Sequence, residues 1–197
     1  VIGWFQGRSE FGPRALGNRS ILADPRNPHM QKKLNLKIKY REGFRPFAPS
    51  VIEEDYKEYF IEDIISPYML IVKSITNSIK EKIPDNYNSL NYWNKLYTRR
   101  SSLQAITHVD FSARIQTVSK LTNPKYWNLL NDFKKISGVS VLVNTSFNVR
   151  GEPIVNSPKD AFMCFMNTEM DYLVIENYLY SKQEQTTKNI KQEYEKD

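Results

Sequence analysis

The sequence is poor in the residues that most often build disulfides, zinc sites and nucleophilic centres. Its 197 residues include one cysteine, Cys164, and two histidines, His29 and His108. One cysteine excludes a disulfide within the chain, and these three residues cannot supply a zinc-binding spacing. Cys164 lies among apolar residues, so we predict a buried core thiol rather than a nucleophile. A cytoplasmic protein without a metal held by its own side chains fits this composition best.

Long apolar runs and familiar nucleotide-binding motifs are also missing. No stretch approaches the ~18 apolar residues that a membrane-spanning helix needs, so we expect no membrane partner. The sequence has no GxxxxGK[ST] loop, no GxGxxG before a helix and no Gly-x-Ser-x-Gly elbow. We therefore do not expect a nucleotide kinase or a Rossmann domain.

The length and the ends of the chain predict its domain organisation. The chain has room for one domain with a real core, and we place that domain at residues 1–182. Residues 183–197 are charged and have few apolar positions, which predicts a flexible tail. The chain starts with Val-Ile-Gly-Trp-Phe and has no leader pattern, so we expect it to be part of a longer protein.

Positive charge is concentrated near the start of the chain. The formal net charge is +6, and residues 1–45 hold ten Lys and Arg against three Asp and Glu, a balance of +7. The recognition helices and interleaved aromatics typical of nucleic-acid binding are not found. A small polyanion is therefore the better partner, and we expect no nucleic acid.

A glycine-punctuated loop at residues 7–20 carries part of this charge. Its glycines and arginines are Gly7, Gly12, Gly17, Arg8, Arg14 and Arg19. Glycine permits tight backbone turns, and planar guanidinium groups match phosphate or carboxylate oxygens. The loop is either an anion-binding loop or a solvated basic turn.

A second group of cations follows a predicted helix over residues 29–39. Lys39, Arg41 and Arg45 lie within seven residues, and Glu42 is the one acid among them. The surrounding aromatics and prolines favour a stiff, partly buried segment. Because stiff buried cations need an anionic partner, we expect this segment to bind one.

Polar side chains follow a predicted central strand over residues 139–143. They are Asn144, Thr145, Ser146 and Asn148. The carboxyl end of a strand is the usual ligand position in an open α/β sheet. The alternative is a polar turn that satisfies its own backbone.

The remaining pattern predicts an α/β fold with a mixed, twisted open sheet flanked by helices. Strands are expected at 1–6, 21–23, 68–75, 105–118 and 171–180, and helices at 53–60, 123–137 and 157–167. Residues 76–100 are predicted to be a partly disordered surface excursion. His108 and Asp110 would lie on opposite faces of one strand, so only one of them should touch a ligand.

Taken together, the sequence resembles the C-terminal part of the carbamoyltransferase family that includes the NodU and CmcH type O-carbamoyltransferases. The matching strings lie at residues 3–20, 39–51, 108–118 and 144–154, which read GWFQGRSEFGPRALGNRS, KYREGFRPFAPSV, HVDFSARIQTV and NTSFNVRGEPI. Two positions depart from the family strings: Ser9 replaces a methionine and Phe111 a glycine.

This resemblance implies a YrdC-like α/β domain that follows a larger actin-like (ASKHA) domain in the same polypeptide. ATP and carbamoyl phosphate would give carbamoyl-adenylate here, and the carbamoyl group would pass to a hydroxyl acceptor in the larger domain. Mg²⁺ would accompany ATP, and no tightly bound cofactor is expected. The alternative is a non-catalytic module that binds an adenine nucleotide or docks a partner.

The resemblance also implies the roles of individual residues. Lys39-x-Arg41 resembles the KxR element of YrdC-like folds, and Ser146-x-Asn148 resembles their SxN element. The implied catalytic residues are Lys39, Arg45 and Ser146. The implied substrate-binding or nucleotide-binding residues are Arg14, Arg41, Arg114, Asn144, Thr145 and Asn148. We predict that Arg14, Lys39 and Arg45 meet in one pocket.

Overall fold

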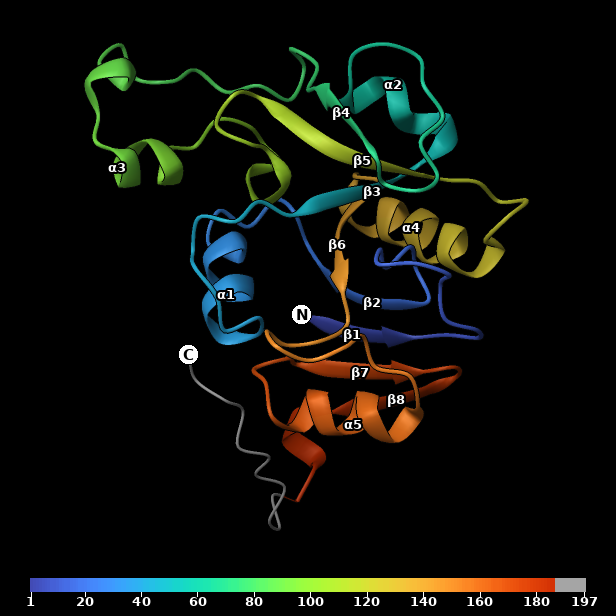
Figure 1. The fold of residues 1–197 in the computed structure, drawn as a ribbon. Helices are drawn as coiled ribbons and strands as arrows, with labels where there is room; N and C mark the ends of the chain where they lie inside the picture. The colour runs from blue at the N-terminus through green and yellow to red at the C-terminus, as the bar shows by residue number, and fades with distance from the viewer. Residues whose placement is uncertain (187–197) are drawn as a thin grey trace.

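The computed structural model describes residues 1–186, which form an eight-stranded sheet with helices on both faces (Figure 1). The strand order is β4-β5-β3-β6-β2-β1-β7-β8. The strands are β1 Ile2–Phe5, β2 Arg19–Ala23, β3 Ala48–Ile52, β4 Ile71–Ser74, β5 Ser112–Val118, β6 Val141–Ser146, β7 Tyr172–Ile175 and β8 Tyr178–Ser181. Two neighbouring pairs, β1 with β7 and β3 with β5, are parallel and the other five are antiparallel. The predicted mixed α/β sheet is confirmed.

Five α-helices are described, and the two longest have the ends that the sequence predicts. They are α1 Met30–Lys37, α2 Tyr56–Tyr59, α3 Tyr92–Tyr97, α4 Pro124–Ser137 and α5 Pro158–Met166. The Asn123 side chain caps α4, and Gly138 ends it in the left-handed region with a φ of 77°. Ser157 and Asp160 form a capping box at the start of α5. None of the helices in the described part of the chain is long and apolar enough to cross a membrane.

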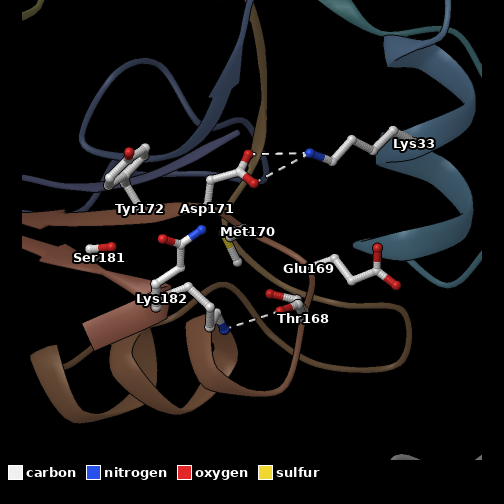
Figure 2. A pocket seen from close by; sticks show the side chains of 9 residues that line it. Lys33, Thr168, Glu169, Met170, Asp171, Tyr172, Ser181 and Lys182 are labelled. Carbon is white, nitrogen blue, oxygen red and sulfur yellow. Dashed lines mark hydrogen bonds and ion pairs between the residues drawn. The ribbon is translucent and has the colours of Figure 1, made fainter. Parts of the chain in front are cut away.

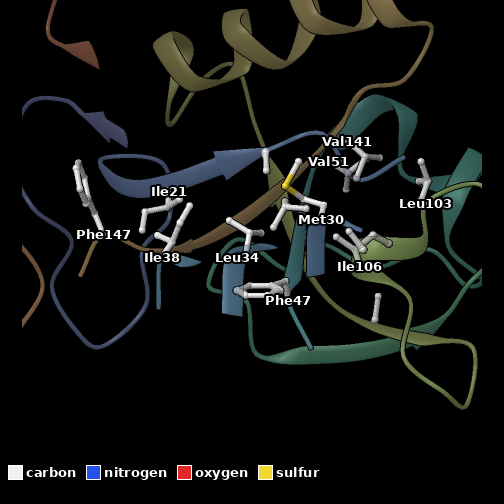
Figure 3. Close-up of a cluster of buried hydrophobic side chains, with 14 of the residues drawn as sticks. Ile21, Met30, Leu34, Ile38, Phe47, Val51, Leu103, Ile106, Val141 and Phe147 are labelled. Atoms are coloured by element: carbon white, nitrogen blue, oxygen red, sulfur yellow. The ribbon is translucent and has the colours of Figure 1, made fainter. Parts of the chain in front are cut away.

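The sheet separates two hydrophobic clusters because successive residues of a strand point to opposite faces. In β6, Val141 and Val143 belong to the larger cluster, whereas Leu142 belongs to the smaller. The larger cluster takes in α1, α2 and α5; Leu34 of α1 is fully buried in it (Figure 3). The smaller takes in α4 through Tyr126, also fully buried. Both faces of the central strands are therefore covered, which holds the ends of β2, β3 and β6 in fixed positions.

The structure differs from the sequence-based prediction at residues 76–100 and 171–180. Residues 171–180 are not one strand but a hairpin of β7 and β8, which turns at Glu176 with a φ of 52°. The left-handed residue is a glutamate, so no glycine marks the turn in the sequence. Residues 76–100 contain α3 and end at Arg100, which is buried and donates to five backbone carbonyl oxygens. This segment is thus anchored, contrary to the prediction of partial disorder. Residues 187–197 of the predicted tail lie outside the described residues.

The glycine-punctuated loop is held together by its own carboxylate. Oε1 of Glu10 accepts hydrogen bonds from the backbone N–H groups of Leu16, Asn18 and Arg19, at 2.6, 2.8 and 3.3 Å. Successive N–H groups that converge in this way form an anion-binding concavity. The loop therefore does bind an anion, but the anion is Glu10.

Arg19 is also used by the loop itself. Its guanidinium donates to the carbonyl oxygens of Gln6 and Gly7, at 2.8 and 3.0 Å, and lies 3.5 Å from the ring centre of Phe5. The side chain is buried, and burial lowers its pKa, against the charges of Glu10 and Glu176. The Arg19 guanidinium is therefore bound within the loop itself.

Glycine is required at position 17 for two reasons. Gly17 has a φ of 111°, and a Cβ there would overlap the ring of Tyr126. Its carbonyl oxygen accepts a hydrogen bond of 2.8 Å from the indole of Trp4. Because the loop packs closely against β1 and α4 at Gly17, the preceding residues Arg14 and Leu16 are fixed relative to the sheet.

Glu10→Ala should destabilise the chain, because three backbone N–H groups lose a charged acceptor. We expect the free energy of unfolding to fall by about 2 kcal/mol, measured by urea denaturation followed by circular dichroism. Glu10→Gln keeps an oxygen acceptor and should lose less than half as much. Equal losses for the two variants would mean that the negative charge, rather than the acceptor geometry, holds the loop.

Candidate functional site

Lys39 is a buried cation at the centre of the candidate site. It follows α1, and 4% of its surface is exposed. Its Nζ donates to Ser146, at 2.8 Å from the carbonyl oxygen and 3.1 Å from Oγ. It also donates to Asn148, at 2.9 Å from the carbonyl oxygen and 2.7 Å from Oδ1. The residues that resemble the KxR and SxN elements are thus in direct contact.

The ligands of Lys39 are fixed by further hydrogen bonds. The hydroxyl of Ser146 donates to Oδ1 of Asn148 at 2.7 Å, and the Asn148 amide donates to the carbonyl oxygen of Glu152 at 2.7 Å. Ser146 Oγ therefore presents a lone pair, not its proton, to Lys39. All four oxygen ligands of the lysine are formally neutral, so its positive charge is not cancelled.

Burial sets the acid–base properties of this cluster. Burial, followed by the nearby positive charge of Arg41, lowers the pKa of Lys39 to about 7. Burial, followed by the charge of Arg45, lowers the pKa of Arg41 to about 10. An anion bound among these groups would raise both pKa values again, because it stabilises the charged forms of Lys39 and Arg41. The cluster is therefore a low-dielectric site with excess positive charge.

The cations surround a small cavity of about 160 Å³. The residues that line it are Lys39, Arg41, Arg45, Ser146, Asn148, Val149, Arg150 and Gly151. Because liquid water takes about 30 Å³ per molecule, this is the volume of roughly five waters. This volume is enough for one compact anionic group.

Glu42 is the acidic side chain next to this cavity. Its carboxylate lies 3.0 Å from Nε of Arg45 and 3.8 Å from Nη1 of Arg150. All three side chains are about half exposed, so solvent screens these ion pairs and they add little to the stability of the fold. Glu42 therefore orients the two arginines more than it stabilises the fold.

Arg14 and Arg114 do not line the cavity. Arg14 is exposed on the glycine-punctuated loop, and its charge acts on Arg114 of β5, whose pKa is lowered first by burial and then by Arg14. Nη2 of Arg114 lies 3.9 Å from Sδ of Met69. The structure brings Lys39 and Arg45 together as predicted, but it does not place Arg14 with them. A role of Arg14 and Arg114 in ligand binding stays a prediction.

Asn144 and Thr145 lie within β6 and also outside the cavity. The buried Asn144 amide donates to the carbonyl oxygen of Ala15 and to side-chain oxygens of Ser50 and Gln116, at 2.9–3.1 Å. This network joins β6, β3 and β5 to the glycine-punctuated loop. The strand thus extends to Ser146, three residues beyond the predicted end, and only Ser146 and Asn148 of the polar group reach the cavity.

His108 and Asp110 precede β5 instead of lying within it. Oγ of Ser112 donates its one proton to Oδ1 of Asp110 at 2.6 Å and accepts from Nδ1 of His108 at 3.1 Å. The prediction that a strand places the two on opposite faces is wrong, because they meet around one hydroxyl. Phe111, directly after Asp110, has a φ of 63°. Glycine adopts this left-handed conformation more readily than phenylalanine does.

A second hollow, of about 480 Å³, lies between α1 and the β7–β8 hairpin (Figure 2). Its cations are paired within the protein: Lys33 binds Asp171 at 3.2 Å, and Lys182 donates to the carbonyl oxygen of Thr168 at 3.1 Å. The Lys39 cavity is smaller, but its buried cation has only neutral ligands. It is therefore the better anion site.

Sequence reasoning missed three residues of this cavity, Val149, Arg150 and Gly151. They directly follow the polar group, and this position could have identified them, because a short turn returns the chain past Asn148. It also missed Asn35, a fully buried residue of α1 that contacts the loop carrying Arg41 and Arg45. A polar residue on a helix gives no sequence signal of burial.

Three relatives indicate what the chain is similar to. An uncharacterised protein of Synechocystis is 56% identical over 197 residues, which is 100% of this chain and 32% of that protein. Nodulation protein NolO of Bradyrhizobium diazoefficiens is 47% identical over 186 residues, 92% of this chain and 30% of that protein. The 3′-hydroxymethylcephem-O-carbamoyltransferase of Amycolatopsis lactamdurans is 38% identical over 184 residues, 93% of this chain and 31% of that protein.

The chain spans about a third of the length of these relatives. The family model for the carbamoyltransferase C-terminus matches residues 1–182. That range contains every strand and α-helix described above and all the residues that line the Lys39 cavity. The chain therefore belongs to the carbamoyltransferase C-terminus family.

Proposed function

We propose that this chain is the part of an O-carbamoyltransferase that binds ATP and carbamoyl phosphate and forms carbamoyl-adenylate. The observation that carries the proposal is the buried Lys39, held by Ser146 and Asn148 in a cavity that Arg41 and Arg45 also line. A relative named for O-carbamoyl transfer supports the chemical class.

The proposed reaction consumes one water. Water releases carbamate and inorganic phosphate from carbamoyl phosphate. A carbamate oxygen then attacks the α-phosphorus of ATP, the bond to the oxygen that bridges to the β-phosphorus breaks, and pyrophosphate leaves with that electron pair. Both steps spread negative charge over phosphoryl oxygens, so catalysis needs positioned cations more than a protein nucleophile.

The cavity residues have separate roles in this scheme. Lys39 and Arg45 stabilise the charge that develops on the reacting oxygens, and Arg41 binds the same phosphoryl group. Ser146 orients the carbamoyl unit, and Asn148 holds Ser146 and Lys39 in place. Because the cavity suits one compact group, the remaining phosphates lie outside it, where we assign Arg14 and Arg114.

The other participants belong to the same proposal. No group of three or more His, Cys, Asp and Glu suited to a metal occurs among residues 1–186. Mg²⁺ would therefore enter on the phosphates of ATP, not on a site made by protein carboxylates. The acceptor site would lie in an actin-like part of the longer polypeptide, and the compartment would be the cytoplasm.

The proposal is tested by exchange of radiolabelled pyrophosphate into ATP, dependent on carbamoyl phosphate. Arg45→Ala should lower the exchange rate and the ATP affinity together, each by at least tenfold, because one cation contacts phosphoryl oxygens in both ground and transition states. Arg99→Ala is the matched control, since Arg99 is similarly exposed and also paired with a glutamate.

The two outcomes of this assay separate the proposal from its alternative. ATP binding without exchange would favour a module that binds an adenine nucleotide and catalyses nothing. A folded chain that binds no ATP at millimolar concentration would contradict an autonomous site.

The affinity for an anion in the cavity should depend on pH through Lys39. Its pKa of about 7 means that the ammonium is present below pH 7 and is lost above it. At pH 6 the native chain should bind pyrophosphate on the order of tenfold more tightly than Lys39→Met. This advantage should shrink as the pH rises to 9. Isothermal titration of both chains cancels the ionisation of the ligand, and parallel pH profiles would exclude Lys39 as the titrating contact.

A further inference from the structure

Asn35 is a fully buried amide on α1, and each of its polar atoms has a partner in the loop that follows the helix. Oδ1 accepts from Nε of Arg41 at 2.7 Å. Nδ2 donates to the carbonyl oxygens of Gly43 and Arg45, at 3.2 and 2.9 Å. The Asn35 carbonyl oxygen also accepts from the backbone N–H of Arg41, at 3.0 Å. One residue therefore binds the side chain of one cavity arginine and the backbone of another.

Apolar packing alone does not account for this choice of residue. Asparagine is a weak helix former, and a buried amide is costly unless its donors and acceptor are all satisfied. The neighbouring Leu34 and Ile38 provide the apolar contacts of α1. Only an amide offers one acceptor and two donors at the same point, which is the set that the Arg41 side chain and two carbonyls require.

The contact to Nε determines how Arg41 faces the cavity. Nε is the guanidinium nitrogen nearest the backbone, so a hydrogen bond there fixes the plane of the group. That bond does not use the two terminal nitrogens at the other end. Within residues 1–186 those terminal nitrogens donate to no protein group. The guanidinium also lies 5.0 Å from the ring centre of Phe47. Asn35 and Phe47 thus hold the plane of the guanidinium group of Arg41, which lines the Lys39 cavity.

We propose that Asn35 is a positioning residue: it orients the fork of Arg41 and places the backbone of Arg45 so that both arginines bind the same phosphoryl group. This inference rests on the proposed function, because it assumes that the Lys39 cavity binds such a group. It adds a residue that does not itself line the cavity, and it predicts that most of the affinity lost when the amide is removed is lost through Arg41.

The test is a double-mutant cycle on pyrophosphate affinity, measured by isothermal titration with the whole chain. Asn35→Leu and Arg41→Ala should each weaken binding about tenfold. If Asn35 acts through Arg41, the double variant should lose about ten- to twentyfold rather than a hundredfold. A hundredfold, additive loss would overturn the positioning role.

Gln31→Leu is the matched control. Gln31 is also a buried amide of α1, and its Nε2 donates to the carbonyl oxygens of Phe44 and Arg45, at 3.4 and 3.2 Å, but it does not contact Arg41. The control variant should lose stability to urea as Asn35→Leu does, yet keep its pyrophosphate affinity within about threefold. Equal affinity losses in the two variants would show general loosening of the loop.

An NMR signal separates the inference from the proposed function. The Arg41 Nε–H resonance, identified by its loss in Arg41→Ala, should be protected from exchange in the native chain and in Gln31→Leu. It should broaden or vanish in Asn35→Leu, with or without ligand. If the native chain shows this protected signal but binds no pyrophosphate, the proposed function fails. If it binds pyrophosphate and Asn35→Leu binds equally well, only the role of Asn35 fails.

Discussion

The candidate site depends on one interaction, the burial of the Lys39 ammonium against neutral oxygens. A buried cation is costly unless it is fully hydrogen-bonded, and Ser146 and Asn148 supply four acceptors. These hydrogen bonds hold the loop after α1 against the end of β6. They therefore join a helix on one face of the sheet to a central strand. The residues on either side of these contacts, Arg41 and Arg150, then line one cavity.

Local rules recovered much of the fold. The ends of α4 and α5 depend on neighbouring residues, and these are confirmed. The hairpin of β7 and β8 was missed because its left-handed residue is Glu176, not glycine. The anchoring of residues 76–100 was missed because Arg100 bonds to distant carbonyls, and composition alone does not show that an arginine will be buried.

The candidate site was predictable only in part, for the same reason. Pairs two residues apart, Lys39 with Arg41 and Ser146 with Asn148, were correctly placed together because one local turn carries both members. Asn144 instead extends the strand and binds Gln116. Which of several adjacent polar residues faces a ligand depends on where β6 ends, and tertiary pairing with β2 sets that position.

The distribution of acids explains why this cluster of cations stays available. Glu10 binds backbone N–H groups, and Glu42 bridges two arginines beside the cavity. Within residues 1–186, Lys39 has no acidic ligand. A carboxylate beside Lys39 would raise its pKa and stabilise the fold, but it would also neutralise the charge that an anionic substrate needs. Neutral carbonyl, hydroxyl and amide oxygens satisfy the ammonium without cancelling it. Lys39 is therefore held in place with its positive charge uncompensated, and an anion bound in the cavity would compensate that charge.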